Sequence, residues 1–332
     1  MWQGLALSAF LTVGGYGLKL LPGLNESGFS PLVLALALGL IVGNLPGFGR
    51  AAATARPGLQ FATRWLLRSG IVLFGLSLTL QQIVALGPSV LVLDLLVVSS
   101  VLLVGYQLGT RVFGLDRETT LLTCAGSAIC GAAAVLATET IIRARPASTS
   151  MAVTTVVLFG SLAMVIYPLL YPLVGLNEDM FGIYIGATVH EVAQVVAAGD
   201  AVGPTALANA VIVKLVRVML LVPFLLVVGQ CWMRRNSKAR NQERGRLVVP
   251  WFALGFVMMV GLNSVAVIPG TLHQGLVLVG QIALTMAMAA LGYETRLDKL
   301  ASLGAKPVAL AMCLFILLTA GGLLSVSLMS RV

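Results

Sequence analysis

Two interrupted apolar stretches decide how this chain folds. Residues 118–141 read ETTLLTCAGSAICGAAAVLATETI, and residues 180–199 read MFGIYIGATVHEVAQVVAAG. Both are apolar enough to lie inside a membrane, yet both are broken near their centres by glycine and polar residues. A backbone that breaks at membrane depth is tolerated only where it is buried in protein or lines a wet cavity. We therefore expect both stretches to lie inside a bundle of other helices.

The composition of the whole chain indicates a membrane protein. Of its 332 residues, 58% are hydrophobic and 10% are charged, and the mean hydropathy is +1.00. Soluble globular domains are about 45–50% apolar and about 25% charged. So few charges cannot cover a soluble surface, which excludes a cytosolic globular enzyme, a disordered chain and a disulfide-stapled secreted domain.

Nine uninterrupted apolar runs accompany the two broken stretches. A hydrocarbon core of about 30 Å needs about 20 apolar residues in a helix. The runs lie near residues 2–21, 31–45, 58–80, 89–110, 150–174, 205–231, 249–267, 273–292 and 307–330. The predicted fold class is an all-α polytopic membrane protein that forms a single integral membrane domain over residues 1–332.

The distribution of charge predicts the orientation of the chain. Basic residues gather in four segments, 46–57, 111–117, 232–247 and 293–306. Three other segments, 22–30, 175–179 and 268–272, carry only the acids Glu26, Glu178 and Asp179. Because cytoplasmic loops hold the excess of Lys and Arg, we expect a cytoplasmic N-terminus and an external C-terminus. The net charge of +9 is thereby explained by topology, and no nucleic acid partner is expected.

The charges that flank the broken stretches predict re-entrant hairpins. Arg117 precedes the first stretch and Arg145 follows it, so both of its ends look cytoplasmic. Glu178 and Asp200 flank the second stretch, so both of its ends look external. This interpretation gives nine spanning helices and two re-entrant or interrupted elements. The alternative is that both stretches span the membrane as broken helices, which gives eleven spans.

Internal repeats favour a transporter. Residues 126–137 match residues 186–197 without a gap, with Gly126 aligned to Gly186, and residues 75–87 match residues 292–304. We expect one repeat over about 1–145 and a second, inverted repeat over about 180–332. Inverted repeats with interrupted helices at corresponding positions are typical of secondary transporters, whose substrate site lies between the breaks.

The first break supplies candidates for a substrate site. Thr123 and Ser127 offer hydroxyl groups, Gly126 and Gly131 let the backbone turn, and Cys130 lies between them. A helix N-terminus exposed at a break presents N–H donors and a partial positive charge, which together attract anions. Close helix packing through small residues would use the same composition.

The second break carries ionisable groups. His190 and Glu191 are adjacent, and Gln194 follows one turn later. We predict that His190 and Gln194 bind substrate and that Glu191 or His190 carries a coupling proton, because ionisable residues inside membranes are functional candidates. A hydrogen-bonded pair that orders the chain is the structural alternative. The motif resembles the zinc-binding HExxH, but Gln194 replaces the second histidine, so no metal, cofactor or catalytic residue is assigned.

Basic residues inside an apolar run complete the predicted site. Lys214 and Arg217 lie within 205–231 and share one helix face, and Asn209 precedes them. Two cations near one acid leave a net positive charge that would attract an anion, although structural ion pairing is the alternative. Asp94 is a lone acid in the run 89–110, which either pairs with a basic neighbour or relays protons.

Three stretches of the sequence resemble a known family. They read LLTCAGSAICGAAAV, ATVHEVAQVVAAG and NAVIVKLVRVMLLVP, and they are similar to the YeiH family of bacterial inner-membrane proteins, which are generally labelled sulfate exporters. The resemblance covers nearly the whole chain. It implies a multi-pass protein of the bacterial inner membrane, distantly related to cation/proton antiporters and anion transporters. The site residues named above rest on the sequence alone.

Together these observations predict a secondary transporter that exports a small anion such as sulfate. We expect the transport to be coupled to protons. An anion channel and an intramembrane metalloenzyme are the alternatives, and the chain is not expected to be an enzyme. The expected partners are the small anion and the lipid bilayer, and a homodimer is left open.

Overall fold

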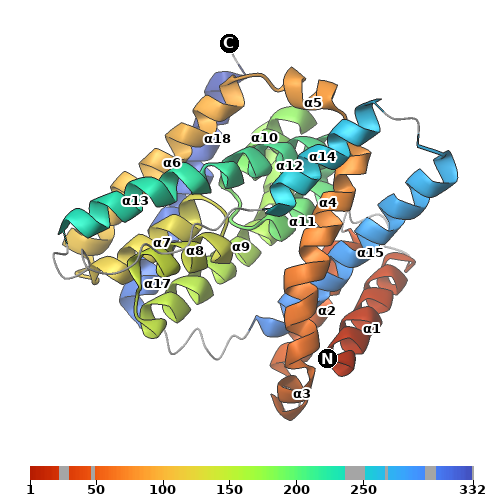
Figure 1. Ribbon diagram of the computed structural model, residues 1–332, viewed down its shortest axis with the longest axis horizontal. Helices are drawn as coiled ribbons and strands as arrows, with labels where there is room; N and C mark the ends of the chain where they lie inside the picture. The colour runs from red at the N-terminus through yellow and green to blue at the C-terminus, as the bar shows by residue number, and fades with distance from the viewer. Residues whose placement is uncertain (22–29, 46–48, 236–250, 266–267, 296–303, 331–332) are drawn as a thin grey trace. The chain divides into compact units, whose positions relative to one another are not determined.

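The computed structural model describes residues 1–21, 30–45, 49–235, 251–265, 268–295 and 304–330 (Figure 1). Every regular element within these ranges is a helix. The predicted all-α fold class is therefore confirmed for the part of the chain that the structure describes.

Five helices are long and apolar enough to cross a membrane. They are Ser89–Val112, Pro146–Val174, Pro204–Trp232, Gly270–Glu294 and Ala305–Met329. The other four expected runs are also helical but are shorter or divided. They form α1 (Trp2–Lys19), α2 (Pro31–Asn44), the consecutive α3 (Gly49–Phe61), η1 (Ala62–Leu66) and α4 (Leu67–Phe74), and α14 (Trp251–Val265). The chain is thus a polytopic membrane protein, while the count of nine spans stays a prediction.

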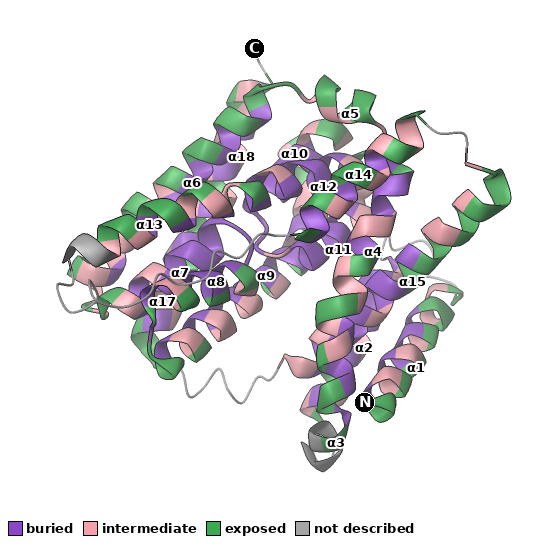
Figure 2. Cartoon of the chain, in the orientation of Figure 1, coloured by how far each residue is buried: buried purple, intermediate pink, exposed green. Residues whose placement is uncertain are grey.

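Many large apolar residues along these helices are exposed, and Figure 2 colours the exposed residues green. Leu103 is 65% exposed, Leu169 is 57% exposed and Leu173 is 77% exposed. Scattered exposure of this kind is ordinary, but rows of it along long apolar helices are what a lipid-facing surface requires.

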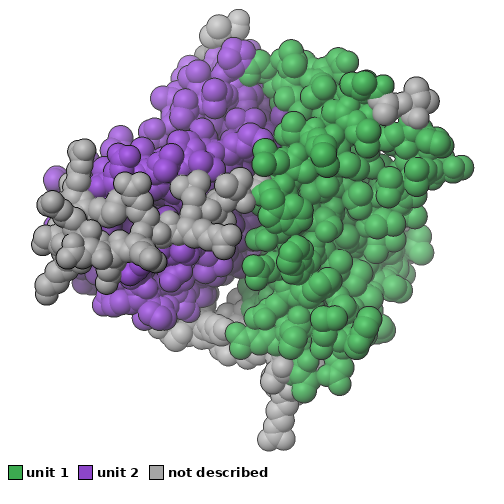
Figure 3. All heavy atoms as spheres, in the orientation of Figure 1, with its two compact units in different colours: residues 1–87, 196–204, 251–298 green, residues 88–195, 205–250, 299–332 purple. Residues whose placement is uncertain are grey.

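The chain divides into two compact units, coloured separately in Figure 3. Unit 1 comprises residues 1–87, 196–204 and 251–298, and unit 2 comprises residues 88–195, 205–250 and 299–332. The predicted repeats, about 1–145 and 180–332, stay a prediction.

Unit 1 is held by close approach of helices through glycine. α15 (Gly270–Glu294) packs on α2, and a Cβ added at Gly292 would collide with the backbone carbonyl of Leu36 and lie 2.9 Å from the amide nitrogen of Leu40. A Cβ at Gly39 would collide in turn with the carbonyl of Ala289. Small residues at such crossings let membrane helices approach closely enough for strong van der Waals packing.

Unit 2 contains short helices as well as longer ones. One pair of short helices is α7 (Arg117–Ala128) and α8 (Ala132–Ile142), and a second is α10 (Glu178–Thr188) and α11 (Val192–Val202), of which residues 196–202 belong to unit 1. The longer helices are α6 (Ser89–Gln107) with η3 (Leu108–Val112), α9 (Pro146–Val174), α12 (Pro204–Met219) with α13 (Leu221–Arg235), and α17 (Ala305–Ile316) with η5 (Leu317–Gly321) and α18 (Gly322–Met329). α7 packs on α6, α9 and α17, and α10 packs on α6 and α18.

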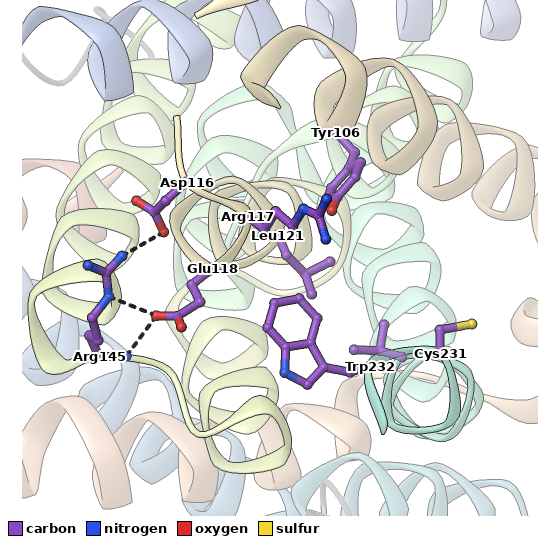
Figure 4. Close-up of a pocket in the computed structure, with 9 residues that line it drawn as sticks. Tyr106, Asp116, Arg117, Glu118, Leu121, Arg145, Cys231 and Trp232 are labelled. Carbon is purple, nitrogen blue, oxygen red and sulfur yellow. Dashed lines mark hydrogen bonds and ion pairs between the residues drawn. The ribbon is translucent and has the colours of Figure 1, made fainter. Parts of the chain in front are cut away.

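The two ends of the first pair meet, so α7 and α8 form a helical hairpin, hairpin 1. Arg145, just beyond α8, places Nη2 2.9 Å from Asp116 Oδ1 and donates from both Nε and its backbone nitrogen to Glu118 Oε2, at 3.1 Å each. Figure 4 shows these contacts beside a cavity of about 370 Å³, which Tyr106 of α6 and Trp232 of α13 also line. We call this end the mouth of hairpin 1.

The two ends of the second pair also meet, and α10 and α11 form hairpin 2. Glu178 Oε1 at the start of α10 accepts hydrogen bonds from the backbone nitrogens of Thr205 and Ala206, at 2.7 and 3.1 Å. Thr205 lies three residues beyond the end of α11. The segments that flank α10 and α11 therefore lie close together, whereas the ends of an element that crossed a membrane would lie about 30 Å apart. The re-entrant course of both stretches in the membrane stays a prediction.

The two hairpins open at opposite ends of α9. Pro146, at the start of α9, follows the mouth of hairpin 1, and Val174, at its end, lies four residues before the start of hairpin 2. A straight helix of 29 residues is about 43 Å long. The mouths are therefore separated by more than the thickness of a hydrocarbon core, and the tips point toward each other.

Some sequence predictions fall outside the described residues. These are the basic cluster between Arg234 and Arg246, the acid Glu26, and most of the second copy of the repeat 292–304. The predicted orientation of the termini and the second repeat relation therefore stay predictions.

The glycine contact in unit 1 yields a stability prediction. We expect Gly292→Val to lower the melting temperature of the detergent-purified protein, because overpacking of a close contact costs about 1–3 kcal/mol. Gly275→Val on the same helix is the matched control, since nothing lies within 4 Å of a Cβ at that position. Equal melting temperatures for the two variants would contradict the contact.

The hairpin mouths yield a second prediction. Glu118→Gln should speed amide hydrogen exchange around Arg145 alone, and Glu178→Gln should speed it around Thr205 alone, so each variant controls for the other.

The pKa of Asp116 makes the mouth of hairpin 1 sensitive to pH. Partial burial raises this pKa, but the hydrogen bonds from Thr119 and the charge of Arg145 outweigh burial and lower it below its ordinary value. Asp116 therefore stabilises the mouth of hairpin 1 fully at pH values above the pKa that Asp116 has in the unfolded chain. This stabilisation is lost as the pH falls through the lowered pKa of the folded protein. Amide hydrogen exchange rates that neither substitution changes would contradict the closed mouths of the two hairpins.

Candidate functional site

The tips of the two hairpins are equivalent breaks in the helices. α7 ends at Ala128 and α8 begins at Ala132, while α10 ends at Thr188 and α11 begins at Val192. Both breaks therefore fall at the positions that the ungapped match of 126–137 to 186–197 pairs. The structure supports this short repeat.

Lys214 of α12 joins the two tips. Its side chain is 0% exposed, and its ammonium group donates to the carbonyl oxygens of Ile129 and Val189, at 2.7 Å each. Ile129 and Val189 are paired by the repeat. Lys214 thus binds the same backbone position in both hairpins, and two of its three N–H donors are used in this way.

Arg217, one turn further along α12, does the same. Its side chain is also 0% exposed. It donates from Nη2 to the carbonyl of Ser127 at 3.2 Å, from Nη1 to the carbonyl of Ala187 and from Nε to the carbonyl of Ala128. Ser127 and Ala187 are again paired by the repeat.

These contacts neutralise two helix ends. The last carbonyls of α7 and α10 have no partner within their own helices, and each end carries about half a negative charge. Two full positive charges therefore face about one negative charge at the tips. The sequence predicted that Lys214 and Arg217 lie at the site, but it did not predict that the backbone is their partner.

Glu191 caps the opposite hairpin. Its carboxylate accepts a hydrogen bond of 3.0 Å from the backbone nitrogen of Ala132, the first residue of α8. Gly131, with a φ of +69°, leaves the space for this side chain, because a Cβ there would collide with Glu191 Cγ. One of the N–H groups expected to face a ligand at this break, that of Ala132, donates to Glu191 instead. Gly131 makes room for the cap.

Gln194 holds hairpin 2 to α9. Its amide oxygen accepts from the backbone nitrogen of Glu191 at 3.0 Å, and its amide nitrogen donates to the carbonyl of Val157 at 3.3 Å. Gly160 of α9 provides the space, because a Cβ there would meet this amide. Both polar ends of Gln194 therefore have protein partners, which is a positioning arrangement.

Four buried polar side chains have no hydrogen-bond partner within the described residues. Thr120, which is 0% exposed, lies eight residues before the tip of hairpin 1, and the other three are Ser127, which is 1% exposed, His190, which is 1% exposed, and Asp94 of α6, which is 0% exposed. His190 and Asp94 both lie within electrostatic range of Lys214 and Arg217, and the carbonyl of Ser127 itself binds Arg217. Buried polar groups normally find partners, so a cluster of exceptions marks a site that a ligand or a proton completes.

The chain is similar throughout its length to a family of bacterial membrane proteins. The family described as "Conserved hypothetical protein 698" matches residues 3–311. The UPF0324 inner membrane protein YeiH of Salmonella typhi is 44% identical over 327 residues, which cover 97% of this chain and 93% of the relative. The chain belongs to this family.

Other relatives agree. YeiH of Escherichia coli strain K12 is 44% identical over 321 residues, covering 96% of this chain and 91% of the relative. A UPF0324 membrane protein of Pseudomonas putida is 46% identical over 324 residues, covering 97% and 91%. No solved structure matches the chain. The resemblance to the YeiH family is confirmed, and several of these relatives are named as inner membrane proteins.

The remaining predicted site residues lie at different distances from the tips of this YeiH-family protein. Cys130 is at the tip of hairpin 1, 6% exposed and within electrostatic range of Lys214. The hydroxyl of Thr123 donates to the carbonyl of Thr119 in its own helix, at 2.8 Å. A Cβ at Gly126 would lie 2.7 Å from Val135. Thr123 and Gly126 therefore serve packing within hairpin 1.

Asn209 lies apart from the tips. Its amide donates to the backbone oxygen of Asp179 at 3.4 Å and to its side chain at 3.2 Å, at the mouth of hairpin 2. It precedes Lys214 by five residues, which is about 7.5 Å along the helix axis. Its contacts tie α12 to the start of hairpin 2.

The alternative of an intramembrane metalloenzyme needs a set of metal ligands. The described ranges contain no group of three or more His, Cys, Asp or Glu side chains that could hold a metal ion.

Aromatic residues next to the tips were not predicted. Tyr167 of α9 and Tyr184 of α10 stack with ring centroids 4.8 Å apart. Both hydroxyls reach Thr319, with Tyr184 donating to its carbonyl at 3.0 Å and Tyr167 lying 3.2 Å from its hydroxyl. Thr319 lies in η5, a π-helical turn, and such turns are frequent at functional sites. A π-turn is invisible in the sequence.

The tips yield a stability prediction. We expect Lys214→Met to destabilise the purified protein strongly, because it leaves two buried carbonyls unpaired at about 1–3 kcal/mol each. Thermal unfolding in detergent measures the loss, and Lys306→Met, at an exposed position, is the matched control. A Lys214→Met variant as stable as the control would show that Lys214 does not hold the hairpins.

Proposed function

We propose that this chain is a secondary transporter of a small anion in the bacterial inner membrane. The observation that carries the proposal is the meeting of two oppositely directed helical hairpins at Lys214 and Arg217. Hairpins that enter from opposite faces and meet near the middle are suited to alternating access, because each can open the same site to one side.

The charge balance favours an anion over a cation. Two cationic side chains face helix ends worth about one negative charge, the carboxylate of Glu191 is matched to the positive end of α8, and Asp94 adds no charge when it is protonated. A bound anion would supply the charge that the tips lack. The third N–H of Lys214 remains for it.

The unpartnered side chains supply the remaining donors. Ser127 contributes a hydroxyl and His190 a ring N–H, each buried and without a partner among the described residues. The carbonyl of Ser127 itself accepts a hydrogen bond from Arg217. His190 follows Val189, whose carbonyl accepts a hydrogen bond from Lys214. An oxyanion at the tips would satisfy both groups, which is the reason that a polar site stays open in an apolar bundle.

Coupling to protons fits the same arrangement. His190 and Glu191 are the ionisable residues at the tip of hairpin 2, so both stay candidates for the coupling group. Anion channels do not need two opposed hairpins around one site, and carrier kinetics separate the two classes.

Counterflow measures the proposed activity directly. Purified protein in liposomes preloaded with unlabelled sulfate should accumulate labelled sulfate transiently and saturably. Phosphate, chloride and nitrate serve as competitors that rank the anion preference. A flux that does not saturate would indicate a channel. Absence of counterflow for every anion, with folded protein shown by thermal unfolding, would refute the transporter.

Substitutions at the unpartnered side chains localise the site. Ser127→Ala and His190→Ala should each weaken anion binding at least about tenfold, because each removes a hydrogen bond to a charged ligand worth about 1.5–3 kcal/mol. Their melting temperatures should change little, since neither group has a protein partner to lose. Thr138→Val in α8 is the control, because its hydroxyl bonds only to its own helix, at Ala134. Unchanged binding in both variants would move the site away from the tips.

A further inference from the structure

Asp94 is a buried acidic residue without hydrogen-bond partners among the described residues, and the proposed anion site does not explain why it is there. It lies on α6 with a side chain that is 0% exposed. Neither carboxyl oxygen has a hydrogen-bond partner within the described residues. Its electrostatic neighbours are Arg217, which acts most strongly, and Lys214.

This surrounding is unsuited to a charged carboxylate. A buried charge needs a paired counter-ion and hydrogen bonds, and Asp94 has no hydrogen bonds here. Arg217 and Lys214 direct their donors to backbone carbonyls at the hairpin tips instead of to this carboxyl. In the arrangement described, Asp94 is therefore best accommodated as a neutral acid.

The same two cations give Asp94 an alternative state. If the tips release Lys214 or Arg217, a charged Asp94 has a counter-ion within electrostatic range on α12. The carboxyl can thus exchange between a neutral form that leaves the cations alone and a charged form that competes for them.

We propose that Asp94 carries the proton that couples anion transport to the proton gradient, which rests on the transporter proposed above. When Asp94 binds a proton, Lys214 and Arg217 keep their positive charge uncompensated and bind the anion. When Asp94 releases the proton, its carboxylate takes the place of the anion as their partner. Anion and proton therefore bind together and leave together.

Other titratable groups around α6 do not fit this role. α7 presents Cys124 and α10 presents Tyr184, whose ordinary pKa values of about 8.5 and 10 lie above physiological pH. The buried faces of α17 and α18, which also pack on α6, hold no charged side chain. Among the described residues, α12 supplies Lys214 and Arg217, and the hairpin 2 tip supplies His190 and Glu191, which the experiment must separate from Asp94.

The experiment measures sulfate binding and transport as functions of pH. Sulfate is the probe because it keeps its double charge across the working range. For the wild type, binding of one proton with each sulfate predicts an affinity that falls by up to about tenfold per pH unit as the pH rises. A weakly buffered solution with a pH dye should show one proton taken up for each sulfate bound.

Asp94→Asn mimics the permanently protonated form. We expect it to retain sulfate counterflow, to bind sulfate independently of pH and to lose accumulation driven by a pH gradient. Asp179→Asn, at the mouth of hairpin 2, should keep both the pH dependence and the accumulation. His190→Ala and Glu191→Gln, assayed for proton uptake, should still take up a proton with sulfate.

Each outcome decides a different claim. Full pH-gradient accumulation in Asp94→Asn, or proton uptake that vanishes only in the His190 or Glu191 variant, would overturn the role of Asp94 and leave the transporter standing. Loss of counterflow in folded Asp94→Asn would show that Asp94 binds sulfate or shapes the site, and would also overturn the coupling role. If Asp94→Asn fails to fold, wild-type sulfate binding without proton uptake overturns the proposal. Wild-type protein without counterflow for any anion would refute the proposed function itself.

Discussion

Unpaired backbone carbonyls at two breaks inside an apolar bundle are the constraint on which unit 2 depends. A helix that ends away from water leaves its last carbonyls without partners, and each such group is costly in an apolar environment. Here Lys214 and Arg217 supply the missing donors for α7 and α10 together. Because one helix, α12, carries both cations, the two tips are fixed to each other as well as to the bundle.

This arrangement links packing to function. The donors that hold the tips are also the charges available to a ligand, so binding a ligand and loosening a hairpin compete for the same groups. A hairpin that moved away would leave its carbonyls unpaired unless water or substrate took over. The unpartnered Ser127 and His190 lie where such a substrate would be received. Glu191 and Gln194, which cap and brace the breaks, keep the tips ordered while this exchange takes place.

Much of this architecture is encoded in patterns that can be read directly from the sequence. The flanking charges Arg117 and Arg145 predicted that the two ends of the first broken stretch lie on one side, and in the structure Arg145 contacts Asp116 and Glu118 at the other end of that stretch. The ungapped match of 126–137 to 186–197 predicted equivalent breaks, and the carbonyls that it pairs share the same cation.

The detailed partners could not be predicted in this way. Which backbone groups face a buried cation depends on how α12 lies against both hairpins, and no local pattern records that placement. Gln194 was predicted to bind substrate, and the sequence did not show that its amide oxygen accepts from the backbone nitrogen of Glu191 or that its amide nitrogen donates to the carbonyl of Val157 in α9. Asp94 precedes Lys214 by 120 residues, so its proximity to the cations is a property of the tertiary fold alone.

The measurement that tests the central claim most directly is sided labelling of single cysteines in intact cells and in inverted vesicles. In a background without the four native cysteines, one cysteine is placed at a time at Gly114, Ala147, Leu176 or Gly203. Two opposed hairpins predict that positions 114 and 147 are labelled from one face, and positions 176 and 203 from the other. Labelling of positions 114 and 147 from opposite faces would show that the broken stretch crosses the membrane, and would contradict the account.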